Sequence, residues 1–438
     1  MSRISRLSLI TVPRSEIELD NLRVVIPVGG EAKRLKPLTC EVSKPVVRFL
    51  NRPIIETVLV SLARQGIRNF IFGVKGYLNY RSLYDYFKEG VEVSARYEIN
   101  PRIHIKYQPR TEDVGSADSL RIVMDYYDVR DPVLVIQGDN ILDIDLPSFV
   151  KFHEERDAFM TIALTKVKEV ESYGIADINS NFGIRRFVEK PSLSEAPSNL
   201  ANAGVYLIDR EIREVFQDKE VQQKISEHNR LDFGMDLIPY VVSSGRRVCG
   251  YVLEGRWFDL GTPVGYLKAM SELLQTGARG IDLEGRVLGE PNMWIQGQSP
   301  ESASRRQDIL RKVKLGRIVL QGGVLIGRHC LIGEGTSISN SSIDNFSIIG
   351  RGSFVSGSAV MDRAVIEDAA EIRESIVGRH AIVKSTHQNP TRISDTSVVG
   401  DDAIIGQGCK IIESRVYPHS KVPDNLELIH EVFGQSPF

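Results

Sequence analysis

The spacing of branched aliphatic residues constrains the second half of the chain more than any other feature. Past about residue 315, isoleucine or valine recurs at intervals of six, six and five residues, usually followed by Gly, Ser, Glu or Asp. The first members of successive sets stand 17 residues apart three times in a row. The sets are Ile326, Ile332 and Ile338, then Ile343, Ile349 and Val355, then Val360, Ile366 and Ile372, then Val377 and Val383. No set can bury itself, so neighbouring coils must stack, as in solenoid repeats.

The next set in this region begins later than the 17-residue interval predicts. Its members are Val399, Ile405, Ile411 and Val416, and it starts 22 residues after Val377. The extra residues fall within 385–395, where we expect a loop to protrude from one coil. The count resembles the hexapeptide repeat of left-handed parallel β-helices, which have three flat strands per coil. An irregular β-sandwich is the alternative.

Residues 22–275 follow another pattern, in which apolar strand-like runs alternate with helix-like segments. Such alternation predicts an α/β domain with a Rossmann-like, mixed or mostly parallel sheet and helices on both faces. A helix is predicted over 53–65, with Pro53 in its first turn and Gly66 at its C-terminal cap.

These patterns predict how the chain is divided into segments. We expect an N-terminal extension over 1–21, the α/β domain over 22–275 and a polar linker over 276–315. An all-β left-handed parallel β-helix over 316–425 and a C-terminal tail over 426–438 would follow. Flat β-helix faces favour self-association, so a homo-oligomer formed through the β-helix is expected.

Length, charge and cysteine content limit the functional classes. A chain of 438 residues is long enough for two separate cores. The 55 basic and 57 acidic side chains nearly balance, which argues against a nucleic-acid partner. The four cysteines form no CxxC pair and no zinc-like cluster, so reduced thiols and a cytoplasmic location are expected. No segment approaches the roughly 18 apolar residues of a membrane span, so no membrane partner is expected.

The stretch VVIPVGGEAKRLKPLT, residues 24–39, ends a strand-like run in a glycine pair. Gly29 and Gly30 leave backbone N–H groups open to a ligand, and oriented amides bind anions. Arg34 and Lys44 follow, and fixed cations of this kind would balance a polyphosphate. A surface turn is the alternative for the glycine pair alone.

Two aspartates follow strand-like runs far apart in the chain. Asp139 ends VLVIQGD, and Asp259 lies in RWFDLGT. Open α/β sheets bind ligands at the C-terminal ends of their strands, and hard cations take oxygen ligands. The pair could therefore hold Mg²⁺ against a triphosphate. A turn or helix-cap role is the alternative for each.

Eight motifs in this region occur in a recognisable order. They are GGEAKRLKPLT with SKP, GSAD at 115–118, GDN, YGI at 173–175, VEKP at 188–191, NAGVY at 202–206, DLIP at 236–239 and WFDLGTP at 257–263. Together with the trailing hexapeptide repeat, they resemble the sugar-1-phosphate nucleotidylyltransferases, which include ADP-glucose and GDP-mannose pyrophosphorylases. The resemblance implies Mg²⁺-assisted, in-line attack of a sugar-1-phosphate on the α-phosphate of a nucleoside triphosphate (NTP). The products would be an NDP-sugar and pyrophosphate.

The resemblance also implies a role for particular residues. Arg34 and Lys44 would be catalytic, and Asp139 and Asp259 would hold the metal. The nucleotide-binding residues would be Gly29, Gly30, Lys33, Gly115, Ser116 and Asp139. The sugar-phosphate-binding residues would be Tyr173, Gly174, Glu189, Lys190, Asn202 and Gly204.

The glycine loop departs from the family pattern GGxGTRL at two positions. Ala32 replaces a glycine and Lys33 a threonine. A left-handed backbone at position 32 would cost alanine about 1 kcal/mol or more, and Lys33 could add charge at the triphosphate. A regulatory relative that binds nucleotide sugars without turnover is therefore an alternative. A lesser alternative is acyl transfer by the β-helix, for which His329, His380 and His387 are available.

Overall fold

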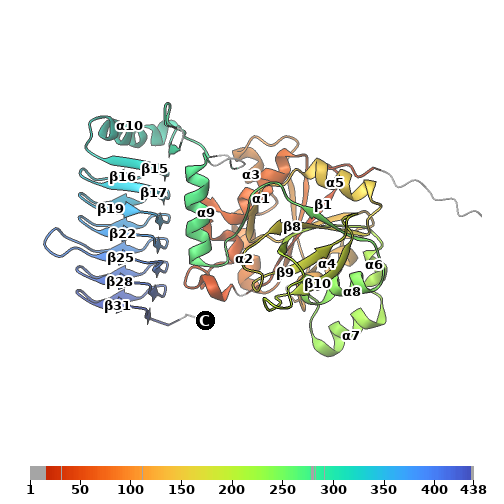
Figure 1. Cartoon of the computed structure of the whole chain (residues 1–438). Coiled ribbons are helices and arrows are strands. Elements are labelled where there is room, and N and C mark those ends of the chain that lie inside the picture. Colours follow the sequence, from red (N-terminus) through yellow and green to blue (C-terminus); the bar gives the residue numbers. More distant parts are fainter. Residues whose placement is uncertain are drawn as a thin grey trace, which may run out of the picture.

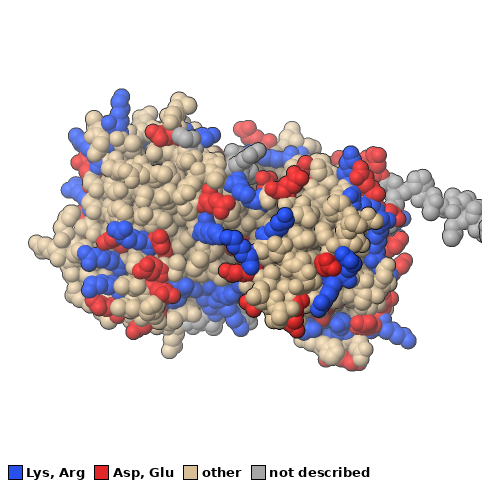
Figure 2. Space-filling view, in the orientation of Figure 1, with Lys and Arg blue, Asp and Glu red and all other residues tan. Residues whose placement is uncertain are grey.

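The computed structural model describes residues 16–30, 32–110, 112–277, 281, 283–290 and 292–435. An α/β domain occupies the first part of the chain and a stack of short parallel strands the last part, side by side (Figure 1). Lys, Arg, Asp and Glu are interspersed over the face of both parts seen in Figure 2. None of the helices in the described ranges is long and apolar enough to cross a bilayer.

The α/β domain is built on a nine-stranded mixed sheet. Its order along the main path is β10-β9-β11-β6-β1-β4-β5, and β8 joins β12 to β11. Strands β5, β4, β1 and β6 run parallel, whereas β11 runs antiparallel to β6. The bounds are β1 Arg23–Val28, β4 Asn69–Val74, β5 His104–Tyr107, β6 Val133–Ile136, β8 Met160–Lys166, β9 Gly174–Ile178, β10 Ile184–Glu189, β11 Leu200–Ile208 and β12 Val248–Val252. The mixed, partly parallel sheet that the sequence predicts is confirmed.

Helices surround this sheet, and the apolar residues of its two faces form two separate cores. The bounds are α1 Ile54–Arg64, α2 Tyr77–Phe87, α3 Val91–Arg96, α4 Ser116–Tyr126, α5 Leu146–Glu155, α6 Ile212–Val215, α7 Lys219–His228, α8 Ile238–Ser243 and α9 Pro263–Gln275. Helix α1 agrees with the predicted helix at 53–65. Pro53 immediately precedes its first residue, and Gly66, with a φ of 110°, follows its C-terminal cap.

The C-terminal strands form a parallel β-helix with three faces. One face contains β16, β18, β21, β24, β27 and β30, and the other two join in one sheet. The coils stack in parallel register, so that Ile349 lies beside Ile366. All the isoleucines and valines of the predicted repeat are buried in one core. The β-helix is therefore confirmed, while its left hand stays a prediction.

The strands of the β-helix are short. Their bounds are β15 Val319–Ile326, β16 Leu331–Ile332, β17 Ser337–Ile343, β18 Ile348–Ile349, β19 Phe354–Ser356, β20 Ala359–Val360, β21 Val365–Ile366, β22 Glu371–Arg373, β23 Ile376–Val377, β24 Ile382–Val383, β25 Arg392–Ser394, β26 Val398–Val399, β27 Ile404–Ile405, β28 Lys410–Ile412, β29 Arg415–Val416, β30 Lys421–Val422, β31 Glu427–Ile429 and β32 Val432–Phe433. The expected loop protrudes between β24 and β25 (Figure 1). Beyond it, Val377 pairs with Val399, which preserves the stack.

The segment expected to be a linker contains regular structure. Strand β14 (Met293–Ile295) pairs in parallel with β15, and helix α10 (Pro300–Lys314) covers the first coil (Figure 1). Ile309 of α10 packs into the β-helix core. Strands β31 and β32 likewise continue the stack into the segment expected to be a tail. A polar composition hid these elements because each buries only a few residues.

The N-terminal extension is described from residue 16 onward, so the rest of that predicted segment lies outside the described residues. The Ile17 amide donates to Glu154 Oε1 at 2.6 Å. Ile17 and Leu19 also pack against the core of the α/β domain. Residues 16–21 are therefore part of that domain's surface.

The two domains share an apolar interface. Helix α9 lies between the α/β sheet and the β-helix (Figure 1). Tyr266 and Met270 of α9 belong to the same core cluster as Leu325 and Ile376 of the β-helix. The β-helix is therefore packed directly against the domain that contains the predicted site.

Candidate active site

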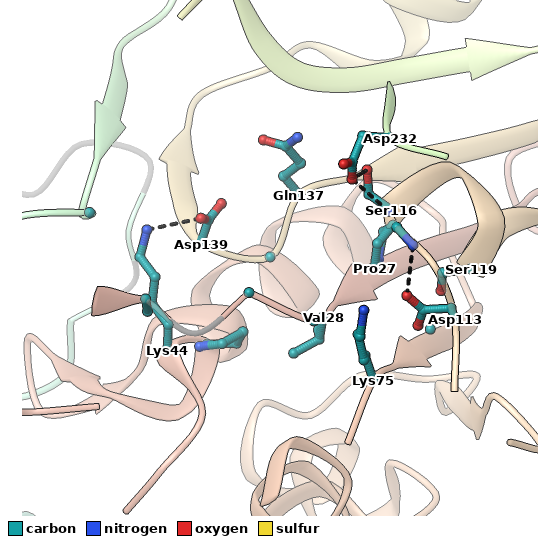
Figure 3. Close-up of a pocket in the computed structure, with 18 of the residues that line it drawn as sticks. Pro27, Val28, Lys44, Lys75, Asp113, Ser116, Ser119, Gln137, Asp139 and Asp232 are labelled. Carbon is teal, nitrogen blue, oxygen red and sulfur yellow. Dashed lines mark hydrogen bonds and ion pairs between the residues drawn. The ribbon is translucent and has the colours of Figure 1, made fainter. Parts of the chain in front are cut away.

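A cavity of about 600 Å³ opens where the parallel strands β1, β4 and β6 end. It brings together the glycine loop, Lys44, the GSAD segment and Asp139 (Figure 3). The predicted residues that line it are Gly29, Gly30, Lys33, Arg34, Lys44, Gly115, Ser116 and Asp139. The C-terminal edge of a parallel sheet is the usual ligand position in open α/β folds.

The glycine loop turns directly from β1 into a short 3-10 helix, η1 (Lys33–Leu35). A Cβ on Gly30 would meet nothing within 4 Å, so the backbone here faces open space. Ala32 has φ 45° and ψ 42°, in the left-handed region. Ala32 therefore has the left-handed backbone that a glycine would adopt without strain. For a residue with a Cβ this conformation costs about 1–2 kcal/mol.

Lys44 lies at the start of the 3-10 helix η2 (Lys44–Val46), in a buried position. Its Nζ lies 2.9 Å from Asp139 Oδ2 and 3.7 Å from Asp259 Oδ1. Figure 3 shows the Lys44–Asp139 pair at one end of the cavity. The two carboxylates and this ammonium thus form one cluster of opposite charges.

A small antiparallel ladder brings the two aspartates together. Strand β7 (Asn140–Leu142) pairs with β13 (Trp257–Asp259), so Asn140 lies opposite Asp259. The Gly261 amide donates to Asp259 Oδ1 at 2.7 Å. A Cβ on Gly261 would lie 3.0 Å from an Arg34 guanidinium nitrogen. Arg34 therefore lies next to the aspartate cluster, as a polyphosphate site requires.

The carboxylates fit a divalent cation. Asp139 Oδ1 is one of three buried side-chain atoms in the described residues that have no hydrogen-bond partner. Its other oxygen, with Asp259, already holds a positive charge, the Lys44 ammonium. Carboxylate oxygens are the ligands that Mg²⁺ prefers, and one or two suffice when phosphates complete the shell.

The residues predicted to bind sugar phosphate lie beside the cavity. The Tyr173 hydroxyl lies 3.5 Å from Asp259 Oδ2, and burial, with the Asp259 charge, raises the Tyr173 pKa to about 12. The Tyr173 ring meets Trp257 edge to face, and the Trp257 indole donates to the Ala203 carbonyl at 3.1 Å. Asn202 Oδ1 accepts from the Gly204 amide at 2.9 Å and so holds the turn in β11.

Glu189 and Lys190 also belong to the residues predicted to bind sugar phosphate. Lys190 has a left-handed backbone, and its amide donates to the Tyr173 carbonyl at 3.0 Å. Burial raises the pKa of Glu189, although the Lys190 charge opposes this. A Cβ on Gly174 would lie 2.5 Å from Glu189 Oε2, which accounts for a glycine at that position. The predicted sugar residues thus form one neighbourhood next to Asp259.

The GSAD segment begins helix α4. Gly115 has φ 151°, and a Cβ there would lie 2.5 Å from the Leu231 carbonyl oxygen. The Ser116 amide and hydroxyl both donate to Asp232 Oδ1, at 3.1 and 3.2 Å. The Ala117 amide donates to Leu231 O at 3.0 Å. Residues 231–232 therefore fix the start of α4 against the cavity.

Five polar residues of the cavity were missed from sequence. Lys75, Asp113, Ser119, Gln137 and Asp232 line it with the predicted set (Figure 3). Lys75 follows β4, so a charged residue directly after a buried strand was a usable signal. Asp113 precedes the glycine of GSAD by two residues. Asp232 gave no local signal, because it approaches through a contact with Ser116 across the fold.

Comparisons with known proteins agree with this geometry. The family model described as nucleotidyl transferase matches residues 23–276, and the GMPPB C-terminal domain model matches 317–431. A mannose-1-phosphate guanyltransferase of Schizosaccharomyces pombe is 26% identical, over 93% of this chain and 98% of the relative.

Two further relatives have related names. A mannose-1-phosphate guanyltransferase of Saccharomyces cerevisiae is 30% identical, over 62% of this chain and 72% of the relative. A UTP--glucose-1-phosphate uridylyltransferase of Synechocystis sp. is 26% identical, over 74% of this chain and 84% of the relative. The chain therefore belongs to the nucleotidyl transferase family, among the sugar-1-phosphate nucleotidylyltransferases that make an NDP-sugar and pyrophosphate from an NTP and a sugar-1-phosphate.

Proposed function

We propose that this chain itself catalyses Mg²⁺-assisted transfer of a nucleotidyl group to a hexose-1-phosphate, in the cavity described above. The observation that supports this most directly is the cluster of Lys44, Asp139 and Asp259 at the open glycine loop. It combines cation-binding carboxylates with fixed positive charge at a place where backbone amides are exposed.

The chemistry requires charge control more than proton transfer. A sugar-1-phosphate oxygen is already anionic, so the barrier comes from aligning two polyanions for in-line attack on the α-phosphorus. Arg34 and the Gly29–Gly30 amides would hold the triphosphate, and Lys44 would move from Asp139 toward the reacting phosphate. A metal ion on Asp139 and Asp259 would neutralise the developing charge.

The second substrate would enter beside Asp259. Tyr173 and Trp257 would form a wall there, Lys190 would offer positive charge to a sugar phosphate, and Asn202 would hold the turn in β11 that faces it. The names of the relatives point to mannose-1-phosphate and glucose-1-phosphate as the first hexoses to test. The cysteines are free and buried, which fits the cytoplasmic location that we propose.

The left-handed geometry at Ala32 supports retained nucleotide binding, because the loop keeps a conformation that costs energy for an alanine. A regulatory subunit that binds nucleotide sugars without turnover would keep the same loop. It is therefore the competing function, and the test below separates the two.

The β-helix histidines favour structural roles over acyl transfer. His329 stacks on Phe346, with ring centroids 4.7 Å apart. His380 Nδ1 lies 3.4 Å from Asp402 Oδ1, and His387 lies over Gly352. Each of the three histidines thus has a packing or polar partner elsewhere in the β-helix.

The test measures pyrophosphate release with Mg²⁺ for four NTPs crossed with glucose-, mannose-, galactose- and N-acetylglucosamine-1-phosphate. Lys44→Ala and Asp139→Asn should each lower kcat by about 10²–10³-fold, the usual effect of removing one preorganised charge. Lys151→Ala, at an exposed position in α5, is the matched control and should leave kcat unchanged. Wild-type rates for both site variants would contradict the assignment. No release for any pair, with clear nucleotide-sugar binding by calorimetry, would support the regulatory alternative.

A further inference from the structure

One corner of the β-helix stacks histidine and aspartate side chains on top of one another. The strand pairing places His380, Asp402 and His419 at equivalent turns of three successive coils. All three have a left-handed backbone, with φ of 57°, 56° and 59°. The Asp402 amide donates to the Arg379 carbonyl at 2.8 Å, and the His419 amide donates to the Asp401 carbonyl at 3.0 Å. Since neighbouring strands lie about 4.8 Å apart, this corner holds two imidazoles and a carboxylate next to one another.

A carboxylate of the α/β domain reaches the same corner. His419 Nε2 lies 2.7 Å from Glu41 Oε1. The ligand atoms of Glu41, Asp402 and His419 all lie within 4.8 Å of one another. His380 Nδ1 lies 3.4 Å from Asp402 Oδ1 and so adds a second imidazole to the group. The His419 ring therefore lies between carboxylates that come from different domains.

These atoms have the chemistry of a transition-metal site. Imidazole nitrogen and carboxylate oxygen are ligands of Zn²⁺, whereas Mg²⁺ prefers oxygen alone. Tetrahedral Zn²⁺ with bonds of about 2.0–2.2 Å keeps its ligand atoms about 3.3–3.5 Å apart. Glu41, Asp402 and His419 are not fully buried, so small side-chain rotations would bring their atoms to that spacing. Without a metal ion, the Glu41–His419 contact is an ordinary pair of a histidine and a carboxylate.

We propose that Glu41, Asp402 and His419 form a site for one Zn²⁺-like transition-metal ion that links the two domains, with His380 as a fourth ligand. The β-helix supplies the histidines and Asp402, and the α/β domain supplies Glu41. The site is separate from the Asp139–Asp259 pair, and its existence does not depend on the proposed nucleotidyl transfer.

The position of Glu41 in the chain gives such an ion a consequence for the cavity. Glu41 lies between the glycine loop and Lys44, which follows it by three residues. The Thr39 hydroxyl donates to the Ala32 carbonyl at 3.1 Å, so this segment is joined to the glycine loop as well. A metal ion that holds Glu41 against the β-helix would therefore restrain the segment that places Lys44.

The test is a titration of the full-length, tag-free chain with Zn²⁺ in competition with a chromophoric chelator. Excess Mg²⁺ is present throughout to occupy Asp139 and Asp259. We expect one Zn²⁺ per chain at the new site. Loss of even an outer-shell partner of a metal ligand typically costs about 10- to 100-fold in affinity. Glu41→Gln, Asp402→Asn and His419→Gln should therefore each weaken Zn²⁺ binding by about 100-fold or more.

The β-helix offers a matched control in another exposed pair of a histidine and a carboxylate. His430 Nδ1 lies 2.9 Å from Glu413 Oε2, and within the described ranges this pair belongs to no group of three potential ligands. His430→Gln should keep the wild-type affinity for Zn²⁺. Absence of stoichiometric binding, or equal weakening by His430→Gln and His419→Gln, would overturn the proposal.

Hydrogen exchange tests whether the ion links the domains. Zn²⁺ should slow amide exchange in residues 36–44 of the wild-type chain and have no such effect in His419→Gln. Wild-type affinity in Glu41→Gln, or binding without protection of 36–44, would place the ion on the β-helix alone and overturn the link. Neither readout uses pyrophosphate release, so a failure of the proposed nucleotidyl transfer would leave this result unchanged.

Discussion

The ion pair between Arg48 and Asp344 should control both the stability of the domain interface and the placement of Lys44. Arg48 belongs to the α/β domain, and its Nη2 donates to Asp344 Oδ1 of the β-helix at 2.8 Å, with a second bond from Nε. The two side chains are 17% and 4% exposed. Burial lowers the pKa of Arg48, but the Asp344 charge and hydrogen bond outweigh this and raise it overall.

The structure allows the size of the effect to be worked out. Asp344→Asn keeps the shape of the side chain but removes the carboxylate that is hydrogen-bonded to the buried Arg48. Breaking one side of a buried pair typically costs about 3–5 kcal/mol. Replacing both partners, as in Arg48→Met with Asp344→Leu, should recover most of the free energy of unfolding that the single variant loses, because the desolvation cost of both charges disappears.

The assay combines denaturant unfolding, monitored with a separate signal for each domain, with steady-state kinetics. Arg48 follows Lys44 by four residues, and Tyr266 of α9 donates to the Arg48 carbonyl at 2.6 Å. Displacing Arg48 should therefore move Lys44, lowering kcat while KM for the nucleotide changes little.

A matched control is available within the β-helix. Arg379 donates to Asp401 Oδ2 at 2.8 Å in a more exposed pair, with side chains 36% and 7% exposed, both of whose members belong to the β-helix. Asp401→Asn should lower stability without the kinetic effect. The reasoning would be refuted if Asp344→Asn cost less than about 1 kcal/mol, a value typical of exposed pairs. It would equally be refuted if the double replacement were less stable than the single one.

Three further outcomes are expected. Ala32→Gly should raise the free energy of unfolding by about 0.5–1 kcal/mol, since release of left-handed strain of about 1–2 kcal/mol exceeds the entropy cost of glycine; an unchanged or lower denaturation midpoint would contradict this. Gly115→Ala should cost about 2 kcal/mol or more, because its Cβ would lie 2.5 Å from a backbone oxygen, whereas Gly30→Ala should leave the melting temperature unchanged. The 2.7 Å contact with Glu41 raises the pKa of His419, so this contact should stabilise the domain interface below about pH 6.5 and fade as pH rises through the folded-state pKa. Because His419 is largely exposed, the effect should stay under about 1 kcal/mol, and His419→Gln should abolish the pH dependence in a series of melting curves.

The sequence predicted the site only where its signals were local. The glycine pair, GSAD and Asp139 each lie next to a strand or helix end that could be located from apolar runs alone. Lys75 and Asp113 also lie next to such elements but were not singled out, and Asp232 was found only in the folded chain. Lys75, Asp113 and Asp232 come from different loops, and no spacing rule connects them.

The sequence by itself determined the β-helix and the α/β class, because both follow from repetition of side-chain type at a fixed period. A β-helix coil buries the branched aliphatic residue of each repeat, such as Ile349, in its interior, whatever the coil packs against. The tertiary structure decided the rest, because long-range contacts depend on how separate elements meet. Pairing of β7 with β13 places Asp259 beside Asp139, and docking of the β-helix sets Asp344 against Arg48, four residues from Lys44. No single segment of the sequence encodes the distance between Asp139 and Asp259 or the distance between Arg48 and Asp344. Each distance arises only when two elements that are far apart in the sequence pack together.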